Sequence, residues 1–386
     1  MLSYRKLAMR VLGRPLHTEG IDSPRPASQR AAAFILTAAM LTTLAAPAFA
    51  DIWHIENGDI TISAGESGNN VTQNNNTTYG DTNTIITNQN KDTASSHTVT
   101  IEAKDKDDKV EVTLKDVNID TSSRNKAAVS VTGEGDTNIK LDGDNALKSD
   151  IYRSGIYGSG SLTISGGEND SLTAQGGSGA NGISSSGSLT ISGGTVTANG
   201  GSGTISGGDG IWSGGGLTVS DGTVTAKGGN GDSKDGYGGD GIRSGGVVTI
   251  SGNTVNAAGG YGGKVGGYGI CSFDRVAISG GTVEAAGGNG STGGGSGIYS
   301  SVIDLSGSLE LTAKAGSPNG KALSQKGSEL VLDTIKDKLG PGAKVTATDA
   351  DGKVIDQVST PRPVEPEGPV IPEESSSSSD GGSATP

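Results

Sequence analysis

Aromatic and charged side chains gather in one part of a repeated unit, and they are the residues of this sequence best suited to hold a ligand. Seven of the ten aromatic residues that follow residue 50 lie around the Gly-Ile dipeptides of that unit. Aromatic rings offer apolar faces to sugar C–H groups, and neighbouring cationic side chains can bind hydroxyl or carboxylate groups. The candidate ligand-binding residues are Tyr157, Trp212, Tyr237, Arg243, Tyr261, Lys264, Tyr268 and Tyr299.

A second candidate site involves two aspartates. Asp209 and Asp240 occupy the same place in the motif Gly-Gly-Asp-Gly-Ile in two successive units. If the units stack, the two carboxylates lie near each other and can share a hard cation such as Ca²⁺, which takes oxygen ligands. Asp209 and Asp240 are therefore the candidate calcium ligands, while a solvated aspartate in a turn is the interpretation that we favour.

Residues for nucleophilic or acid–base catalysis are sparse. The only cysteine is Cys271, which we expect to be either a small apolar filler or a surface residue without a function. His54 and His97 are the only histidines after residue 50. A polysaccharide lyase needs acidic and basic groups in one groove. Because the candidate residues come from separate units and turns, we expect no enzymatic activity and keep a lyase as an alternative. The best such cluster is Asp240, Arg243, Lys264, Asp274 and Arg275.

The elements that must position these side chains follow from an internal repeat over residues 155–316. Six units of about 28 residues each contain a Gly-Ile dipeptide, a strand pattern of the type Leu-Thr-Ile-Ser and a strand pattern of the type Thr-Val-Thr-Ala. A glycine-rich turn follows each unit. The six dipeptides are Gly155-Ile156, Gly182-Ile183, Gly210-Ile211, Gly241-Ile242, Gly269-Ile270 and Gly297-Ile298.

This repeat predicts an all-β fold, a right-handed, three-faced parallel β-helix with about 28 residues per coil. One coil cannot bury its own apolar face, so coils must stack. We expect residues 51–154 to form divergent N-terminal coils with an Asn-rich loop at 67–90. Residues 317–358 should form a capping coil with strands at 321–324, 329–333 and 344–347. The 67 glycines and 3% aromatic residues agree with thin layers of small side chains rather than one large globular core.

The two ends of the chain carry different signals. Residues 1–50 combine a basic region, an uncharged apolar stretch and the motif Ala48-Phe49-Ala50, which predicts a signal peptide cleaved after Ala50. Residues 359–386 are rich in Pro and Ser and should form a disordered spacer. We therefore expect a protein that is secreted, extracellular or at the cell surface, with cell-wall association suggested by the spacer.

The charge of the chain limits its partners. The net charge is −13, and the basic N-terminal segment accounts for part of the positive charge. Nucleic acid is thus an unsuitable partner, because phosphate binding needs a basic patch. After the N-terminal segment there is no apolar stretch of about 20 residues, so we expect no transmembrane segment in the mature chain.

The repeated phrase Gly-Ser-Leu-Thr-Ile-Ser-Gly-Gly-Thr-Val-Thr-Ala at 187–198, followed by Gly-Gly and a Gly-Ile strand, resembles the secreted carbohydrate-binding β-helix proteins of clostridia and related gut Firmicutes. Residues 97–147 are similar to the opening coils of that family, and adhesin-like surface proteins share such Gly-rich repeats. The resemblance implies a parallel β-helix that binds acidic, pectin-like polysaccharide without cleaving it, with calcium in some members. Where the family usually has the turn Gly-Ala-Gly-Ile-Gly-Gly-Gly, this chain has Gly-Asp-Gly-Ile-Trp-Ser-Gly-Gly-Gly.

The sequence therefore predicts a non-catalytic β-helix that binds extracellular polysaccharide through its Gly-Ile face. The main alternative is an adhesin-like structural surface protein that binds a protein partner, and a polysaccharide lyase is the third.

Overall fold

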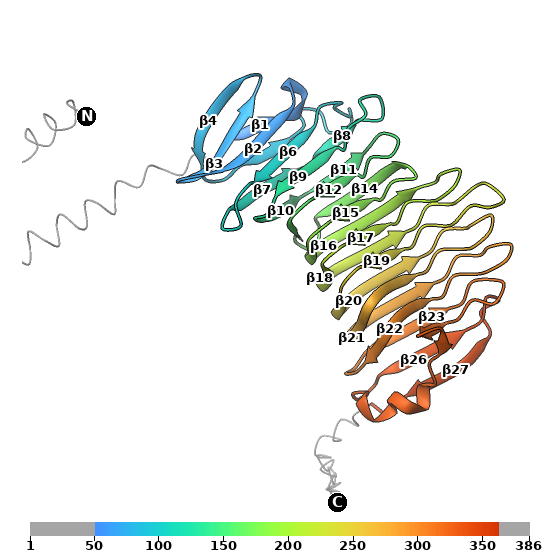
Figure 1. The fold of residues 1–386 in the computed structure, drawn as a ribbon. Helices are drawn as coiled ribbons and strands as arrows, with labels where there is room; N and C mark the ends of the chain where they lie inside the picture. Colours follow the sequence, from blue (N-terminus) through green and yellow to red (C-terminus); the bar gives the residue numbers. More distant parts are fainter. Residues whose placement is uncertain (1–50, 363–386) are drawn as a thin grey trace, which may run out of the picture. The chain divides into compact units, whose positions relative to one another are not determined.

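A computed structural model describes residues 51–362, and it confirms the predicted parallel β-solenoid. The solenoid has about nine turns with rungs about 28 residues apart, and it is 56% strand and 3% helix. Successive coils follow one another along the body, from the N-terminal strands to the C-terminal strands (Figure 1). The predicted signal peptide and most of the Pro/Ser-rich tail lie outside the described residues.

Three ladders of parallel strands give the coil its three faces. Face 1 is built from the Leu-Thr-Ile-Ser strands, face 2 from the Thr-Val-Thr-Ala strands, and the third, the Gly-Ile face, from the short strands that begin with Ile. Long strands turn from face 1 to face 2 at a bend, as β16 does at Gly193 and Gly194. The strands of the repeat are β12 (Ile156–Gly158), β13 (Ser161–Ser165), β14 (Ser171–Ser178), β15 (Ile183–Ser185), β16 (Ser188–Gly201), β17 (Ile211–Ser213), β18 (Gly216–Lys227), β19 (Ile242–Ser244), β20 (Val248–Ala258), β21 (Ile270–Ala286), β22 (Ile298–Leu305) and β23 (Glu310–Lys314).

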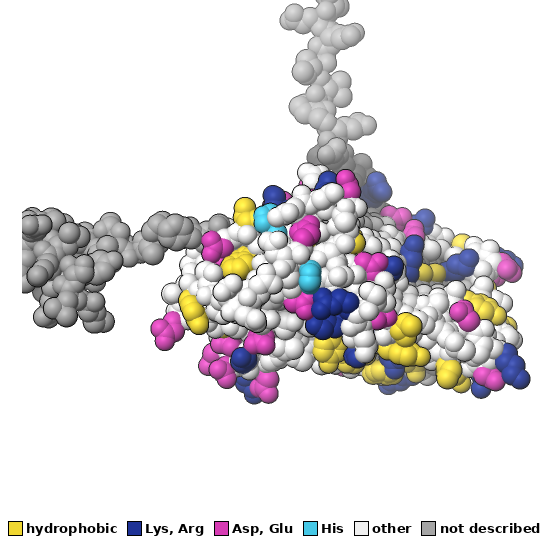
Figure 2. Space-filling view, turned by 90° about the horizontal axis from the view of Figure 1, so that it is seen from above, with side chains coloured by type: hydrophobic (Ala, Val, Ile, Leu, Met, Phe, Trp, Pro, Cys, Tyr) yellow, Lys and Arg dark blue, Asp and Glu magenta, His cyan; other side chains and the backbone are white. Residues whose placement is uncertain are grey.

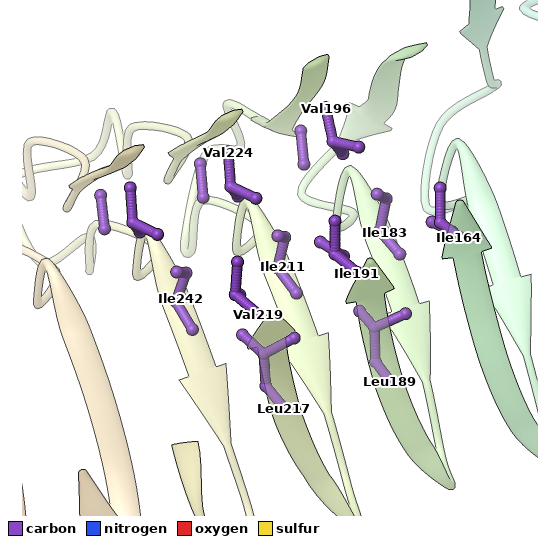
Figure 3. Close-up of a cluster of buried hydrophobic side chains, with 14 of the residues drawn as sticks. Ile164, Ile183, Leu189, Ile191, Val196, Ile211, Leu217, Val219, Val224 and Ile242 are labelled. Carbon is purple, nitrogen blue, oxygen red and sulfur yellow. The ribbon is translucent and has the colours of Figure 1, made fainter. Parts of the chain in front are cut away.

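The core consists of columns of aliphatic side chains inside the coil. Ile183, Ile211 and Ile242 pair in register along the Gly-Ile face and are fully buried. Leu, Ile and Val side chains from the other two faces meet them, as the close-up in Figure 3 shows. Burial of one such side chain is worth roughly 1.5–3 kcal/mol. Because each column passes from coil to coil, every coil completes the burial of its neighbours.

Between face 2 and the Gly-Ile face, the chain leaves the coil in a glycine arm and returns. The four glycine arms are residues 199–210, 227–241, 258–269 and 286–297, and they extend to one side of the solenoid (Figure 1). Within one arm the N–H of Gly239 donates to the carbonyl of Gly229, at 2.8 Å, and the N–H of Gly260 donates to Gly239 of the preceding arm, also at 2.8 Å. The segments predicted as glycine-rich turns are therefore stacked, hydrogen-bonded layers.

Glycine is required in these layers because neighbouring backbones touch. A Cβ atom added at Gly239 would lie 2.0 Å from the carbonyl oxygen of Gly208, and one at Gly260 would lie 2.0 Å from that of Gly229. No side chain fits such a distance, so the glycine content of the repeat follows from packing between arms.

The N-terminal part continues the three faces, but the expected loop at 67–90 is wrong. This region forms an antiparallel hairpin of β3 and β4 against β2, and β5 follows it. The inward positions of β3 include Asn69 and Gln73, whose side-chain amides donate to backbone carbonyls, Gln73 to His54 and Gly58. Because buried amides take the place of apolar residues, the sequence of β3 does not show the apolar–polar alternation that indicates a strand. The elements are β1 (Ile52–His54), η1 (Ile55–Asn57), β2 (Ile60–Gly65), β3 (Gly68–Gln73), β4 (Asn76–Asp81), β5 (Ile85–Thr87), β6 (Val99–Ala103), β7 (Lys109–Lys115), β8 (Asn118–Asp120), β9 (Val129–Gly133), β10 (Asp136–Asp142) and β11 (Asp144–Lys148).

The C-terminal end closes the core, although not with the strand predicted at 329–333. Of that segment only Glu329 is in a strand, β25, and from Leu332 the chain forms a 3₁₀ helix, η2, whose buried Leu332 and Ile335 join the core cluster. The carboxylate of Glu329 accepts hydrogen bonds from the N–H groups of Ala322 and Leu323, which ends the Gly-Ile ladder. The elements here are β24 (Leu323–Gln325), β25 (Ser328–Glu329), η2 (Leu332–Lys338), β26 (Lys344–Thr348) and β27 (Val354–Ser359). Over residues 51–362 no helix has the length and apolar character needed to cross a membrane.

The packing of the glycine arms makes a prediction about stability. Gly239→Ala should lower the free energy of unfolding by at least about 1–3 kcal/mol, because the new methyl group overlaps the carbonyl of Gly208. Gly293→Ala is the matched control in the next-but-one arm, since its Cβ would meet only the Val265 side chain at 3.8 Å. Denaturant unfolding followed by circular dichroism measures both variants. Equal stability of the two would contradict the arm packing.

Candidate functional site

The residues that follow Ile on the Gly-Ile face form one continuous column. They pair in register along parallel strands, so each lies one rung from the next, about 4.8 Å away. Tyr157 is 44% exposed, and Trp212, Arg243 and Tyr299 are half-buried. We call this set the surface column: Tyr157, Ser184, Trp212, Arg243, Cys271 and Tyr299.

Two members of the surface column are covered rather than exposed. Ser184 lies between Tyr157 and Trp212, and Cys271 lies between Arg243 and Tyr299, so each small residue has a large side chain on both sides. Both are buried. Burial, together with the nearby Asp240 charge, raises the pKa of the Cys271 thiol to about 12. Cys271 is therefore a protonated filler at neutral pH, one of the two roles expected for it.

Aromatic contacts link the column to its neighbours. Tyr268 stacks on Tyr299, with ring centroids 4.9 Å apart and planes inclined by 17°. The guanidinium of Arg243 lies 5.4 Å from the ring centroid of Phe273, which is itself 56% exposed. The sequence reasoning did not select Phe273, because that residue follows the dipeptide by three positions in one unit only. The structure thus adds an aromatic ring beside Arg243.

The two aspartates belong to a ladder of side chains that bind backbone. The side-chain oxygen of Asn181 accepts the N–H of Asp209 at 2.8 Å, Asp209 accepts the N–H of Asp240 at 2.7 Å, and Asp240 accepts the N–H of Tyr268 at 2.7 Å. Both aspartates are buried, so the expectation of a solvated aspartate in a turn is wrong. One oxygen of each carboxylate therefore serves the next coil.

This geometry bears on the calcium prediction without deciding it. In the described part of the chain, no group of three or more His, Cys, Asp and Glu side chains is arranged to hold a metal ion. A cation here would depend on the remaining oxygens of Asp209 and Asp240 and on backbone carbonyls. The calcium site stays a prediction.

Burial makes the aspartate pair costly to ionise. Burial raises the pKa of Asp209 to about 6, against a hydrogen bond from the backbone of Asp240 and the positive charge of Arg243. Burial and the charge of Asp209 raise the pKa of Asp240 to about 7, again against Arg243. Arg243 is thus the cation that faces both carboxylates. Its Nε is buried and has no hydrogen-bond partner among residues 51–362.

The remaining predicted residues lie on the glycine arms and not on the surface column. Tyr237 and Tyr261 are 45% and 49% exposed, and Lys264 places its ammonium 5.7 Å from the ring centroid of Tyr237. The structure thus divides the predicted site into a surface-column group with Tyr268 and an arm group of Tyr237, Tyr261 and Lys264. The sequence placed all of them in one third of the coil, because it could not show that the arms leave the coil.

The cluster considered for acid–base catalysis is engaged in separate contacts. Asp240 accepts a backbone N–H, Lys264 contacts Tyr237, and Arg275 pairs with Asp304 at 3.6 Å. These contacts use three parts of the coil: the aspartate ladder, the arm and face 1. They give these residues structural partners, and the expectation that the protein has no enzymatic activity stays a prediction.

A groove of about 450 Å³ lies at the N-terminal end of the surface column, and sequence reasoning missed it. Its floor includes four successive rungs of the Gly-Ile face, and its rim comes from the turns at 125–127 and 152–154. The signal in the sequence is the pair Tyr152-Arg153 just before the first Gly-Ile dipeptide. The lining residues are Thr98, Thr100, Asn125, Lys126, Ala127, Ser130, Tyr152, Arg153, Ser154, Tyr157 and Ser184.

Comparison of the chain with family models, with curated proteins and with solved structures finds no match. The resemblance to carbohydrate-binding β-helix proteins therefore stays a prediction, and the argument for function depends on the geometry of this chain.

The buried aspartates predict a pH-dependent stability. Because their folded pKa values are raised, the folded state favours the protonated forms, and stability falls as pH rises from the ordinary value of 3.8 through about 7. Asp240→Asn keeps an acceptor for the N–H of Tyr268, as Asn181 does for Asp209, but carries no charge. We expect the variant to be more stable than the parent by about 1–3 kcal/mol at pH 8 and to lose that advantage near pH 4.

Thermal and denaturant unfolding across this pH range measures the effect. Asp232→Asn changes an exposed carboxylate in a glycine arm and serves as the control with no comparable gain. An Asp240→Asn advantage that is the same at pH 4 and pH 8 would show that charge burial is not its cause.

Proposed function

We propose that this protein is a non-catalytic module that binds extracellular polysaccharide along its Gly-Ile face. The observation that carries the proposal is the surface column, in which partly exposed aromatic rings recur at fixed rungs of a rigid ladder. Tyr157 and Trp212 are two rungs apart, about 9.6 Å at 4.8 Å per rung. An extended sugar chain that follows the solenoid axis meets a ring at each of these rungs.

The polar groups beside the rings suit a sugar chain that carries charge. Arg243 lies in the same column as Trp212, one rung away, and Phe273 and Tyr299 follow on the C-terminal side. Rings bind the apolar faces of sugars, while guanidinium groups bind hydroxyls and carboxylates in a fixed geometry. Acidic, pectin-like glycans are the preferred class, and calcium bridging at Asp209 and Asp240 remains part of this proposal.

The setting of the protein is proposed from the sequence. A cleaved N-terminal signal would deliver residues 51 onward to the outside of the cell, and the Pro/Ser-rich tail would act as a spacer near the cell surface or wall. The signal segment and residues 363–386 of the tail lie outside the described residues.

A second candidate function is adhesion to a protein partner, favoured by the exposed apolar side chains of the glycine arms. Ile205, Tyr237 and Tyr261 are 72%, 45% and 49% exposed, and they lie on three successive arms. Such side chains are typical of the centre of protein interfaces. Binding that depends on the arms and is indifferent to glycans would support this candidate.

The proposed function predicts a loss of affinity when a ring of the column is removed. Trp212→Ala should weaken binding to polygalacturonate or another bound glycan by about tenfold, equivalent to about 1.4 kcal/mol, because the ring's contact with sugar is lost. Isothermal titration calorimetry measures the affinity, and circular dichroism checks the fold. Addition of a chelator tests the calcium contribution in the same assay.

Tyr79→Ala is the matched control, since Tyr79 is 77% exposed on β4 and does not belong to the column. An unchanged affinity in Trp212→Ala, or an equal loss in Tyr79→Ala, would contradict binding along the surface column. If the parent protein binds no glycan, the proposed function is wrong, and adhesion to a protein partner is favoured instead.

A further inference from the structure

We propose that the groove at the N-terminal end of the surface column is a subsite for a carboxylate-bearing sugar residue, held by Arg153 and Lys126 between the rings of Tyr152 and Tyr157. This inference depends on the proposed function and deepens it, because it locates the point at which an acidic polysaccharide is distinguished from a neutral one. Of these four residues, only Tyr157 is among the candidate ligand-binding residues chosen from the sequence.

The charge of the groove is opposite to that of the chain. Asp and Glu outnumber Lys and Arg in this protein by 42 to 29, yet the eleven residues that line the groove include Lys126 and Arg153 and no acidic residue. In Figure 2, basic side chains lie beside a histidine and a group of hydrophobic side chains, with acidic side chains near them. A locally positive groove on an acidic protein favours an anionic ligand.

The two cations differ in their existing partners. The ammonium of Lys126 lies 3.1 Å from a carboxylate oxygen of Asp59, which also binds Arg124 at 2.7 Å and His97 at 3.2 Å. Burial would raise the pKa of Asp59, but the hydrogen bonds from Arg124, Thr98 and Lys126 hold it well below its ordinary value. One carboxylate is therefore shared by two permanent cations, which leaves positive charge at the groove.

Arg153 has no carboxylate partner among the described residues. Its Nε donates to the side-chain oxygen of Asn125 at 3.2 Å, and this contact orients the guanidinium while its two terminal nitrogens stay available. The one acidic residue in the adjacent turn, Asp150, accepts the backbone N–H groups of Asn125 and Ile151. A planar guanidinium held by one bond is suited to bidentate binding of a carboxylate.

Tyr152 takes the left-handed turn conformation that Asn125 takes one coil earlier, and its N–H donates to the carbonyl of Ser178. Its φ is +60°, a region that costs energy for a residue with a large side chain, and its side chain is nevertheless 79% exposed. The edge of the ring covers Gly179, and the rest faces solvent. Tyr157, on the floor of the groove, is 44% exposed. The two rings thus provide apolar surfaces on a groove whose cations provide charge.

The groove also leads into the surface column. Its floor contains Thr100, Ser130, Tyr157 and Ser184, which are consecutive rungs, and Trp212 is the next rung. A sugar chain bound in the groove can continue over Trp212 without leaving the face. The half-buried hydroxyl groups of Thr100 and Ser130 on the floor can bond to sugar hydroxyls.

The test compares two probes, oligogalacturonide of defined length and its fully methyl-esterified form, by calorimetry with the whole protein. We expect the parent protein to bind the acid at least about tenfold more tightly than the ester. Arg153→Gln should remove most of that preference, with little change in affinity for the ester. Tyr152→Asn, which tolerates positive φ, should weaken binding of both probes. Lys227→Gln removes an exposed cation at the end of β18, where the glycine arm begins, and should change neither affinity.

Each result has a distinct meaning. An acid preference in the parent that persists in Arg153→Gln, or equal affinities of the parent for acid and ester, overturns the subsite and leaves binding along the surface column intact. Binding of neither probe, nor of any other glycan, by a folded parent protein overturns both proposals. Loss of preference in Arg153→Gln together with unchanged thermal stability supports the subsite, because the effect is then not one of folding.

Discussion

Parallel pairing between coils of nearly equal length is the constraint on which this molecule depends. Each strand takes its hydrogen bonds from the coil before and the coil after, so a residue at one position of the repeat must lie against the residue at the same position in the next coil. Where the position faces inward, the result is a column of Ile, Leu, Val or Ala. Where it faces outward, the result is a column of side chains at regular rungs.

In the glycine arms, the same pairing between coils restricts which residues the chain can contain. There the chain runs out and back, and each run hydrogen-bonds to its own partner run and to the arm beside it. The backbones approach so closely that Cβ atoms have no room, which explains why a protein with so little bulky apolar content can still be ordered in these segments. Polar residues between the glycines add to this order, since Asp209 and Asp240 accept backbone N–H groups of the next coil.

Function is proposed at the place where repetition stops. Faces 1 and 2 carry mostly Ser and Thr at their outward positions, with exceptions such as Asn256, Ala277 and Glu284. The surface column changes at every rung, from Tyr to Ser, Trp, Arg, Cys and Tyr. A rigid ladder holds these different side chains at fixed separations, so ring and cation positions are set before any ligand arrives. Preorganisation of this kind reduces the entropy lost on binding. The groove at the N-terminal end adds two cations to that array.

The sequence alone predicted the repeat of about 28 residues, the three strand patterns and the inward columns. Alternation and spacing are local properties, and they recur in every coil. The location of aromatic residues near the Gly-Ile dipeptides was predictable for the same reason. Tertiary structure decided the rest. The hairpin of β3 and β4 could not be predicted because its buried Asn69 and Gln73 bond to backbone groups far away in the sequence. The glycine arms could not be predicted because their hydrogen-bond partners lie in other coils. The groove joins turns that contain Lys126 and Arg153, one coil apart in sequence, and only stacking brings them to one rim.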